Sequence, residues 1–159
     1  MRGLAPDKPS NRQVVARNRK AKRDFHIEET IEAGIELTGT EVKAAREGNV
    51  SLQEAYAMVE GREVFLHNMH IGPYRHGNIH NHEPKRTRRL LLHRKEIDSL
   101  YGRVRQQGYT LVPLSMYFKR GWAKVEIAVA KGKSYYDKRE KIKKEEAKRR
   151  MDRAVRRPY

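Results

Sequence analysis

The chain contains no cysteine among its 159 residues. A protein without thiols forms no disulfide, has no thiol nucleophile and cannot hold zinc through cysteine. The sequence also lacks any apolar stretch near the ~20 residues of a membrane-spanning helix, and no apolar signal segment follows its basic start. These absences favour a protein that works in the reducing cytoplasm and has no membrane partner.

Hydrophobic residues are scarce as well, at 37 %. That share is below the usual one for globular domains, and it allows one modest core in a single domain. Asp and Glu number 20 against 36 Lys and Arg, so the formal net charge is +16. A surface this positive favours a polyanionic partner, which is nucleic acid, an anionic membrane or an acidic protein.

The excess charge lies almost entirely at the two ends of the chain. Residues 1–23 carry +7, residues 131–159 hold 13 basic and 5 acidic residues for a net +8, and residues 24–130 carry only +1. Basic arms on a nearly neutral body are typical of proteins that bind phosphate backbones. We therefore predict a flexible basic arm over 1–17, an RNA-binding body over 18–130 and a basic tail over 131–159.

Two alternatives share this charge pattern. One is a pair of solvated, disordered tails with no specific partner, and the other is a structural ribosomal protein with basic extensions. Aromatic and apolar residues are interleaved with the charges at both ends, which favours a specific polyanionic partner over simple solvation.

Alternating apolar residues predict antiparallel strands in the body. Residues 56–59 and 64–68 form a predicted hairpin, and residues 110–118 and 122–129 form a second one. Pro113 cannot donate to a strand ladder, so it marks an edge or a bulge. With the weaker stretches included, we predict about six strands, which suits a closed or partly open antiparallel barrel.

Short helices are predicted between these strands. Apolar residues from Ile97 to Val104 recur at i, i+3, i+4 and i+7, and Gly108 ends this helix. Thr40 is the predicted N-cap of another helix, which Gly48 ends. The whole body then holds two or three helices.

Seven histidines raise the question of a metal site. His67 and His70 are three residues apart on a predicted strand, so they point to opposite faces and cannot easily share a metal. His80 and His82 lie in a long loop with no nearby carboxylate beyond Glu83. We expect no metal site, and we interpret these loop histidines as groups that stack on or hydrogen-bond RNA.

The sequence shows no nucleophile motif, phosphate-binding loop or dinucleotide fingerprint. Four carboxylates cluster within nine residues, at Glu28, Glu29, Glu32 and Glu36. Paired carboxylates support acid–base chemistry, so a magnesium-dependent nuclease is an alternative. A strand edge balanced by basic neighbours is the simpler interpretation, and we expect a non-enzymatic protein without a cofactor.

The tail begins with a motif suited to nucleic acid. Gly132, between Lys131 and Lys133, allows the backbone to approach a phosphate closely. Tyr135 and Tyr136 offer flat faces for base stacking, worth about 1–3 kcal/mol per base. The apolar stripe beyond them is ragged, so we expect the tail to be disordered alone and helical along RNA.

Three blocks carry a resemblance to a known family. They are EAGIELTGTEVK at 32–43, RRLLLHRKEI at 88–97, and VAKGK at 129–133 followed by DKR at 137–139. From about residue 18 to residue 144 the sequence closely resembles the SmpB family, the SsrA-binding proteins of bacteria. Three separate blocks in the right order make this resemblance specific.

The resemblance implies a six-stranded, antiparallel, oligonucleotide-binding-like (OB-like) barrel with about three short helices and a basic tail that is disordered or helical. It implies binding to the tRNA-like domain of transfer-messenger RNA, and delivery of that RNA to stalled ribosomes for tagging of the nascent chain. The tail would enter the empty message channel near the decoding centre. The shared RNA would bring elongation factor Tu and alanyl-tRNA synthetase as further partners.

Carried over position by position, the family's RNA-binding residues match Glu32, Leu91 and His93. His93 also precedes the predicted helix, so a helix cap and an RNA contact both remain open for it. Further expected contacts with this RNA are the basic residues Arg19, Lys20, Lys22, Lys124 and Lys131. The tail positions expected at the decoding centre are Gly132, Lys133, Tyr136, Asp137, Lys138 and Arg139. Several relatives have histidine where this chain has Tyr136, which keeps a stacking surface without the imidazole.

Overall fold

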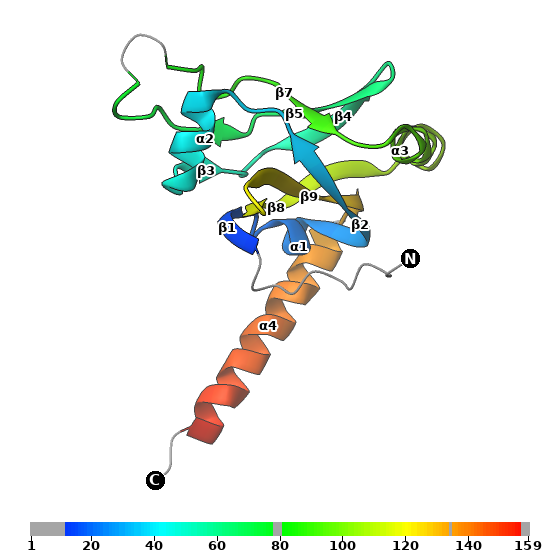
Figure 1. Ribbon diagram of the computed structural model, residues 1–159. Helices are drawn as coiled ribbons and strands as arrows, with labels where there is room; N and C mark the ends of the chain where they lie inside the picture. Colours follow the sequence, from blue (N-terminus) through cyan, green and yellow to red (C-terminus); the bar gives the residue numbers. More distant parts are fainter. Residues whose placement is uncertain (1–11, 78–80, 134, 157–159) are drawn as a thin grey trace, which may run out of the picture.

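The computed structural model describes residues 12–77, 81–133 and 135–156, with side chains described to 133 and from 139 to 154 (Figure 1). Within these ranges the chain forms nine strands and four helices. In chain order they are β1 (Arg12–Arg17), α1 (Ala21–Asp24), β2 (Phe25–Ile35), α2 (Gly39–Arg46), β3 (Val50–Ser51), β4 (Tyr56–Glu60), β5 (Glu63–His67), β6 (His70–Ile71), β7 (Arg88–Leu91), α3 (Arg94–Gln107), β8 (Thr110–Lys119), β9 (Trp122–Gly132) and α4 (Tyr135–Arg156).

Seven strands form one antiparallel sheet in the order β1-β8-β4-β5-β7-β2-β9, and β8 also pairs with β9. β3 and β6 form a separate two-stranded sheet. The predicted mainly antiparallel fold is confirmed, but the predicted counts of six strands and about three helices are too low for the described ranges. β3 and β6 have only two residues each, too few for an alternating pattern to be visible in the sequence.

The first described strand lies in the segment expected to be an arm. β1 pairs with β8 from Arg12 opposite Lys119 to Arg17 opposite Ser115. The apolar run Val14-Val15-Ala16 in the middle of this basic segment supplies the strand-forming residues. Residues 12–17 are therefore part of the sheet rather than of a flexible extension.

Pro113 marks a bulge in β8. The register between β8 and β9 shifts between Pro113 and Ser115. Because side chains alternate along a strand, the extra residue at the bulge reverses the face of the sheet to which the following side chains of β8 point. Leu111 faces the core before the bulge, and Met116 and Phe118 face it afterwards.

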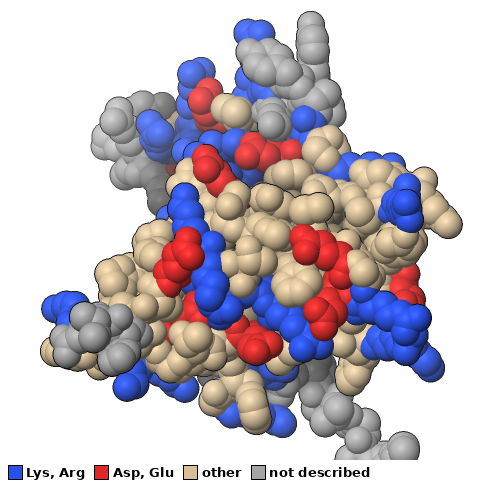
Figure 2. Space-filling model, turned by 90° about the horizontal axis from the view of Figure 1, so that it is seen from above, with Lys and Arg blue, Asp and Glu red and all other residues tan. Residues whose placement is uncertain are grey.

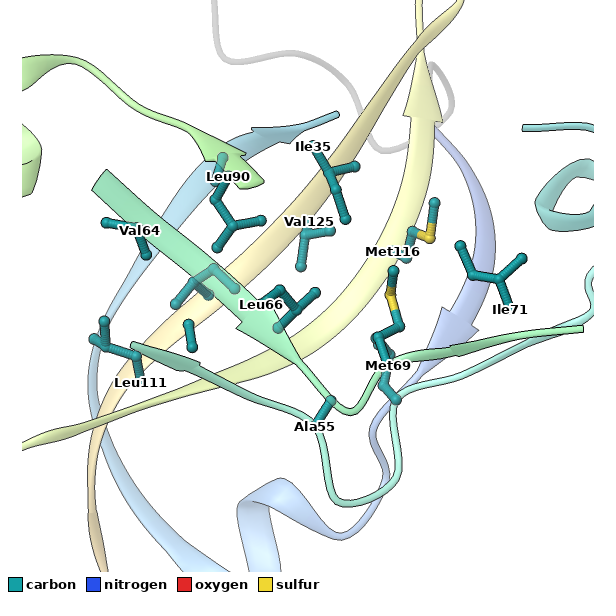
Figure 3. Close-up of a cluster of buried hydrophobic side chains, with 14 of the residues drawn as sticks. Ile35, Ala55, Val64, Leu66, Met69, Ile71, Leu90, Leu111, Met116 and Val125 are labelled. Atoms are coloured by element: carbon teal, nitrogen blue, oxygen red, sulfur yellow. The ribbon is translucent and has the colours of Figure 1, made fainter. Parts of the chain in front are cut away.

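The core fills the inside of the curved main sheet (Figure 3). Val64 and Leu66 of β5, Leu90 of β7, and Val125 of β9 meet there with exposed fractions of 2 % or less. Each such side chain stabilises the fold by about 1.5–3 kcal/mol through burial. Leu100 contributes the buried side of α3, as its predicted helical stripe requires.

A buried ion pair connects α2 to the first residue of β7. The side chains of Glu41 and Arg88 are both fully buried, and the Glu41 carboxylate accepts hydrogen bonds from Arg88 Nε and, at 2.6 Å, from Arg86. Burial raises the pKa of Glu41, but the hydrogen bonds from Arg86, the Thr38 N–H and Arg88 outweigh it and hold the pKa below its usual value. Thr38, rather than the predicted Thr40, is the N-cap of α2.

α4 runs for 22 residues and stands away from the sheet (Figure 1). It contains no Gly or Pro, and acidic residues precede basic ones by four positions, as in Glu140 with Lys144 and Glu145 with Arg149. This spacing stabilises helices with little apolar surface. The tail is thus helical from Tyr135 to Arg156, the second of the two states considered for it. No helix in the described parts of the chain is long and apolar enough to cross a membrane.

Candidate nucleic-acid interface

Three neighbouring strands bring one outward row of side chains together. Gly34 of β2 lies opposite Leu91 of β7 on one side and opposite Lys124 of β9 on the other. Cross-strand partners point to the same face of a sheet, so all three positions share one face. Glu32, two residues before Gly34, points to this face as well.

Gly34 leaves space in the middle of the row. A Cβ atom at this position would lie 3.1 Å from the Cβ atom of Leu91. The surface here forms an open hollow of about 430 Å³, whose lining includes Glu32, Arg89, Leu91, His93, Glu96 and Lys124. Leu91 is 49 % exposed, so the hollow offers an apolar wall to a ligand.

Four of the expected RNA-binding residues therefore meet at one place: Glu32, Leu91, His93 and Lys124. They come from three separate strands and from the start of α3. Together they supply an anionic acceptor, an apolar surface, a ring and a cation. This combination suits a partner with bases, sugars and phosphates.

The Glu32 carboxylate is held in place by residues that the sequence analysis did not identify. Tyr117 donates its hydroxyl proton to Glu32 Oε2, Lys119 Nζ lies 3.4 Å from both carboxylate oxygens, and Arg12 lies 3.5 Å from Oε2. Burial raises the pKa of Glu32, but the bond from Tyr117 and the charges of Lys119 and Arg12 outweigh it, and the pKa is lowered overall. Glu32 is thus an ionised acceptor at neutral pH.

Tyr117 is 1 % exposed and lies opposite Val14 of the neighbouring strand β1. The Arg12 guanidinium stacks over its ring at 4.6 Å from the centroid. Burial first, and the bond to Glu32 second, raise the pKa of Tyr117 far above its usual value. The tyrosine therefore stays protonated and keeps donating to Glu32.

His93 takes the N-cap position of α3, and its backbone N–H donates to Glu96 Oε1 at 3.2 Å. Its side chain is exposed at the hollow. The two roles considered for His93 are therefore compatible, since the backbone caps the helix while the ring faces outwards.

The other expected contact residues lie elsewhere. Arg19 and Lys20 line a separate hollow of about 260 Å³ beside β3, and the backbone carbonyl of Lys22 accepts hydrogen bonds from the tail. The Lys131 ammonium stacks over the Tyr109 ring at 4.7 Å. The structure does not bring these four residues to the hollow around Gly34.

The root of the tail is bonded to α1. The N–H of Lys133 donates to the Asp24 carbonyl at 2.9 Å, and the side chains of Lys133 and Lys141 donate to the Lys22 carbonyl at 3.1 and 2.6 Å. Gly132 ends β9 and has open space around it. Arg139 is exposed on α4, whereas the side chains of Tyr136, Asp137 and Lys138 lie outside the described part of the structure.

The acidic cluster of the sequence does not converge in space. Arg103 of α3 pairs with Glu28 at 3.6 Å and also with Glu29, whereas Glu32 bonds Tyr117. Glu29 and Glu32 are three residues apart on β2 with a regular register between them, so they point to opposite faces of the sheet. The carboxylates that suggested a nuclease are thus divided, with Glu28 and Glu29 beside Arg103 and Glu32 beside Tyr117.

Among the residues that the structure describes, no three His, Asp or Glu side chains are grouped to hold a metal ion. His82 instead bonds within the body, since Nε2 donates to the Ile71 carbonyl at 2.8 Å and Nδ1 accepts from Thr40 at 2.9 Å. Figure 2 shows one face of the molecule, where Lys and Arg alternate with Asp and Glu instead of forming one block. On this face, acidic and basic side chains are therefore interspersed.

Comparison with known proteins decides the family. The family model described as SmpB protein matches residues 15–157 of this chain. The chain belongs to the SmpB family. Other SmpB-type proteins are similar over almost their whole length. The SsrA-binding protein of Geobacillus thermodenitrificans is 59 % identical over 144 residues, which cover 91 % of this chain and 93 % of the relative.

Two further comparisons extend the SmpB match. The SsrA-binding protein of Trichodesmium erythraeum is 54 % identical over 153 residues, covering 96 % of this chain and 98 % of the relative. A chain from the solved structure named "tmRNA-SmpB: a journey to the center of the bacterial ribosome" has a TM-score of 0.64 and 46 % identity. The match covers 79 % of this chain and 92 % of the solved one.

Proposed function

We propose that this chain binds the tRNA-like domain of transfer-messenger RNA through the hollow around Gly34, and delivers this RNA to stalled ribosomes in the cytoplasm. The observation that carries the proposal is the convergence of Glu32, Leu91, His93 and Lys124 on this hollow. The printed names of the relatives, SsrA-binding protein, support the same RNA class. The role is one of binding rather than catalysis, and the sheet acts as an OB-like barrel.

The chemistry of the hollow fits a folded RNA. The ionised Glu32 carboxylate accepts hydrogen bonds, so it selects base amino groups or ribose hydroxyls over phosphates. Lys124 attracts a phosphate, and the exposed Leu91 side chain packs on a base or sugar. Because Tyr117 and Lys119 already orient the carboxylate, little ordering free energy is lost when RNA binds.

The tail supplies the second contact of the proposal. The body over 18–130 holds transfer-messenger RNA, while the basic tail over 131–159 enters the empty message channel and reaches the decoding centre. Its contacts there would come from Gly132, Lys133, Tyr136, Asp137, Lys138 and Arg139. The bound RNA brings elongation factor Tu and alanyl-tRNA synthetase into the same complex.

A salt titration with matched lysine variants tests the RNA site. Lys124→Ala removes a cation at the hollow, whereas Lys85→Ala removes an exposed one from the loop before β7. Filter binding to transfer-messenger RNA should show a weaker Lys124→Ala complex whose log–log salt slope is smaller by about 0.9. Lys85→Ala should bind as the unmodified protein does. Equal affinity of the unmodified protein for transfer-messenger RNA and for arbitrary RNA of the same length would refute the proposal.

Truncation tests the division between body and tail. A chain ending at Gly132 keeps all of β9 and loses α4. It should bind isolated transfer-messenger RNA with nearly unchanged affinity but fail to support tagging on ribosomes stalled on truncated messages. Tyr136→Ala should likewise reduce tagging more than RNA binding. A truncated chain that no longer binds the RNA would contradict this division.

A further inference from the structure

A second hollow adjoins the first. It encloses about 450 Å³ and shares Gly34, Leu91 and Lys124 with the first. Its remaining lining is mainly apolar and includes Leu37 and Phe118. A ligand bound in the first hollow can therefore extend into the second without leaving the surface.

Trp122 lines this second hollow and is 72 % exposed. It follows a tight turn in which Arg120 and Gly121 have φ of 53° and 81°, and it lies opposite Lys119. Such two-residue hairpin turns fix the register of the strands. The backbone position of Trp122 is thus set by the sheet, and water covers most of the side chain.

The surroundings of Trp122 favour an anionic aromatic ligand. Lys124 is two residues further along β9, on the same face and about 7 Å away along the strand. The lining holds one cation, Lys124, and one carboxylate, Glu36, and the cation is the one that shares the strand and the face of Trp122.

We propose that Trp122 stacks on an unpaired nucleobase of the RNA held in the first hollow, while Lys124 contacts the phosphate group of the same strand. The inference rests on the proposed function, and it adds a stacking site to it. A flat aromatic face next to a cation is the arrangement by which proteins hold unpaired nucleotides. A covering base also removes the exposed indole from water, which is favourable in itself.

Intrinsic fluorescence reports on this site directly, because Trp122 is the single tryptophan of the chain. Addition of transfer-messenger RNA should quench the indole emission in proportion to the complex measured by filter binding. Trp122→Ala should weaken RNA binding about 5- to 150-fold, the range for loss of one stacked base. Trp122→Phe keeps an aromatic face and should retain most of the affinity.

A salt titration separates stacking from charge. Trp122→Ala should leave the salt slope unchanged, whereas Lys124→Ala lowers it by about 0.9. Circular dichroism should show the same fold for all three variants, since the replaced side chains lie outside the core. If the unmodified protein selects transfer-messenger RNA, but its emission does not change and Trp122→Ala binds equally well, stacking is refuted and the proposed function stands. Loss of selectivity in the unmodified protein refutes the proposed function itself.

Discussion

Replacement of Tyr117 by phenylalanine tests how firmly the Glu32 carboxylate is held. The substitution removes one hydroxyl group and keeps a ring that is 1 % exposed, so the packing of the core is unchanged. A hydrogen bond to a charged group contributes about 1.5–3 kcal/mol. The Glu32 side chain is 31 % exposed and keeps Lys119 and Arg12, so water and these cations replace part of the lost bond. We therefore expect the free energy of unfolding to fall by about 1–2 kcal/mol at pH 7.

The assay is urea unfolding followed by circular dichroism, with Tyr101→Phe as the matched control. Tyr101 is 41 % exposed, and its hydroxyl bonds Arg105 on the surface of α3. This control should unfold at the same urea concentration as the unmodified protein. The affinity of Tyr117→Phe for transfer-messenger RNA should also fall, because Glu32 loses the donor that orients it.

The pH dependence gives a second readout. The folded-state pKa of Glu32 is lowered, so its interactions add stability above the pKa of the unfolded chain and lose it as the pH falls through the folded value. The difference between Tyr117→Phe and the unmodified protein should thus be full at pH 7 and shrink under acid conditions. A difference that is absent, or that stays constant from neutral to acid pH, would refute this account of Glu32.

Three further predictions concern stability and the shape of the site. Glu41→Gln leaves the buried Arg88 guanidinium without its counter-ion and should lower the free energy of unfolding by about 3–5 kcal/mol in a urea titration. Its control is Glu63→Gln, in a half-exposed ion pair, which should lower the free energy of unfolding by about 1 kcal/mol or less. Gly108→Ala should lower the melting temperature, because Gly108 caps α3 with φ of 69°. Gly102→Ala, inside the same helix, has open space around it and should raise the melting temperature. Each substitution should change the free energy of unfolding by about 0.5–1 kcal/mol. Gly34→Ala should fold normally and bind transfer-messenger RNA more weakly in filter binding, because its new methyl group would enter the hollow 3.1 Å from the neighbouring leucine Cβ atom.

Much of the fold could be predicted from the sequence wherever periodicity was long enough to read. The hairpin of β4 and β5, the pairing of β8 with β9, and the end of α3 at Gly108 are all confirmed. The two-residue strands left no such pattern. Pro113 indicated the bulge, but the sequence did not show that Leu111 and Met116 would consequently share the core.

The candidate site, like the fold, could be predicted from the sequence only in part. The resemblance supplied Glu32, Leu91 and His93, and the structure adds that they face one hollow. The partners of Glu32 could not be found from the sequence, because Tyr117 is 85 positions away in the chain and comes close only through the pairing of β2, β9 and β8. The ion pair of Glu41 with Arg88 spans 47 positions and was missed for the same reason. A sequence shows which charged residues are close together along the chain, whereas these two contacts depend on the order of the strands in the sheet.

The anchorage of α4 has a mechanical consequence. A helix of 22 residues is about 33 Å long, and Lys141 near its start and Lys133 just before it donate hydrogen bonds to the Lys22 and Asp24 carbonyls of α1. α1 is therefore the point of attachment about which α4 tilts. A tilt of about 10° at this point moves the far end of α4 by about 6 Å, so a slight rearrangement of the four-residue helix α1 changes the direction of the whole charged helix.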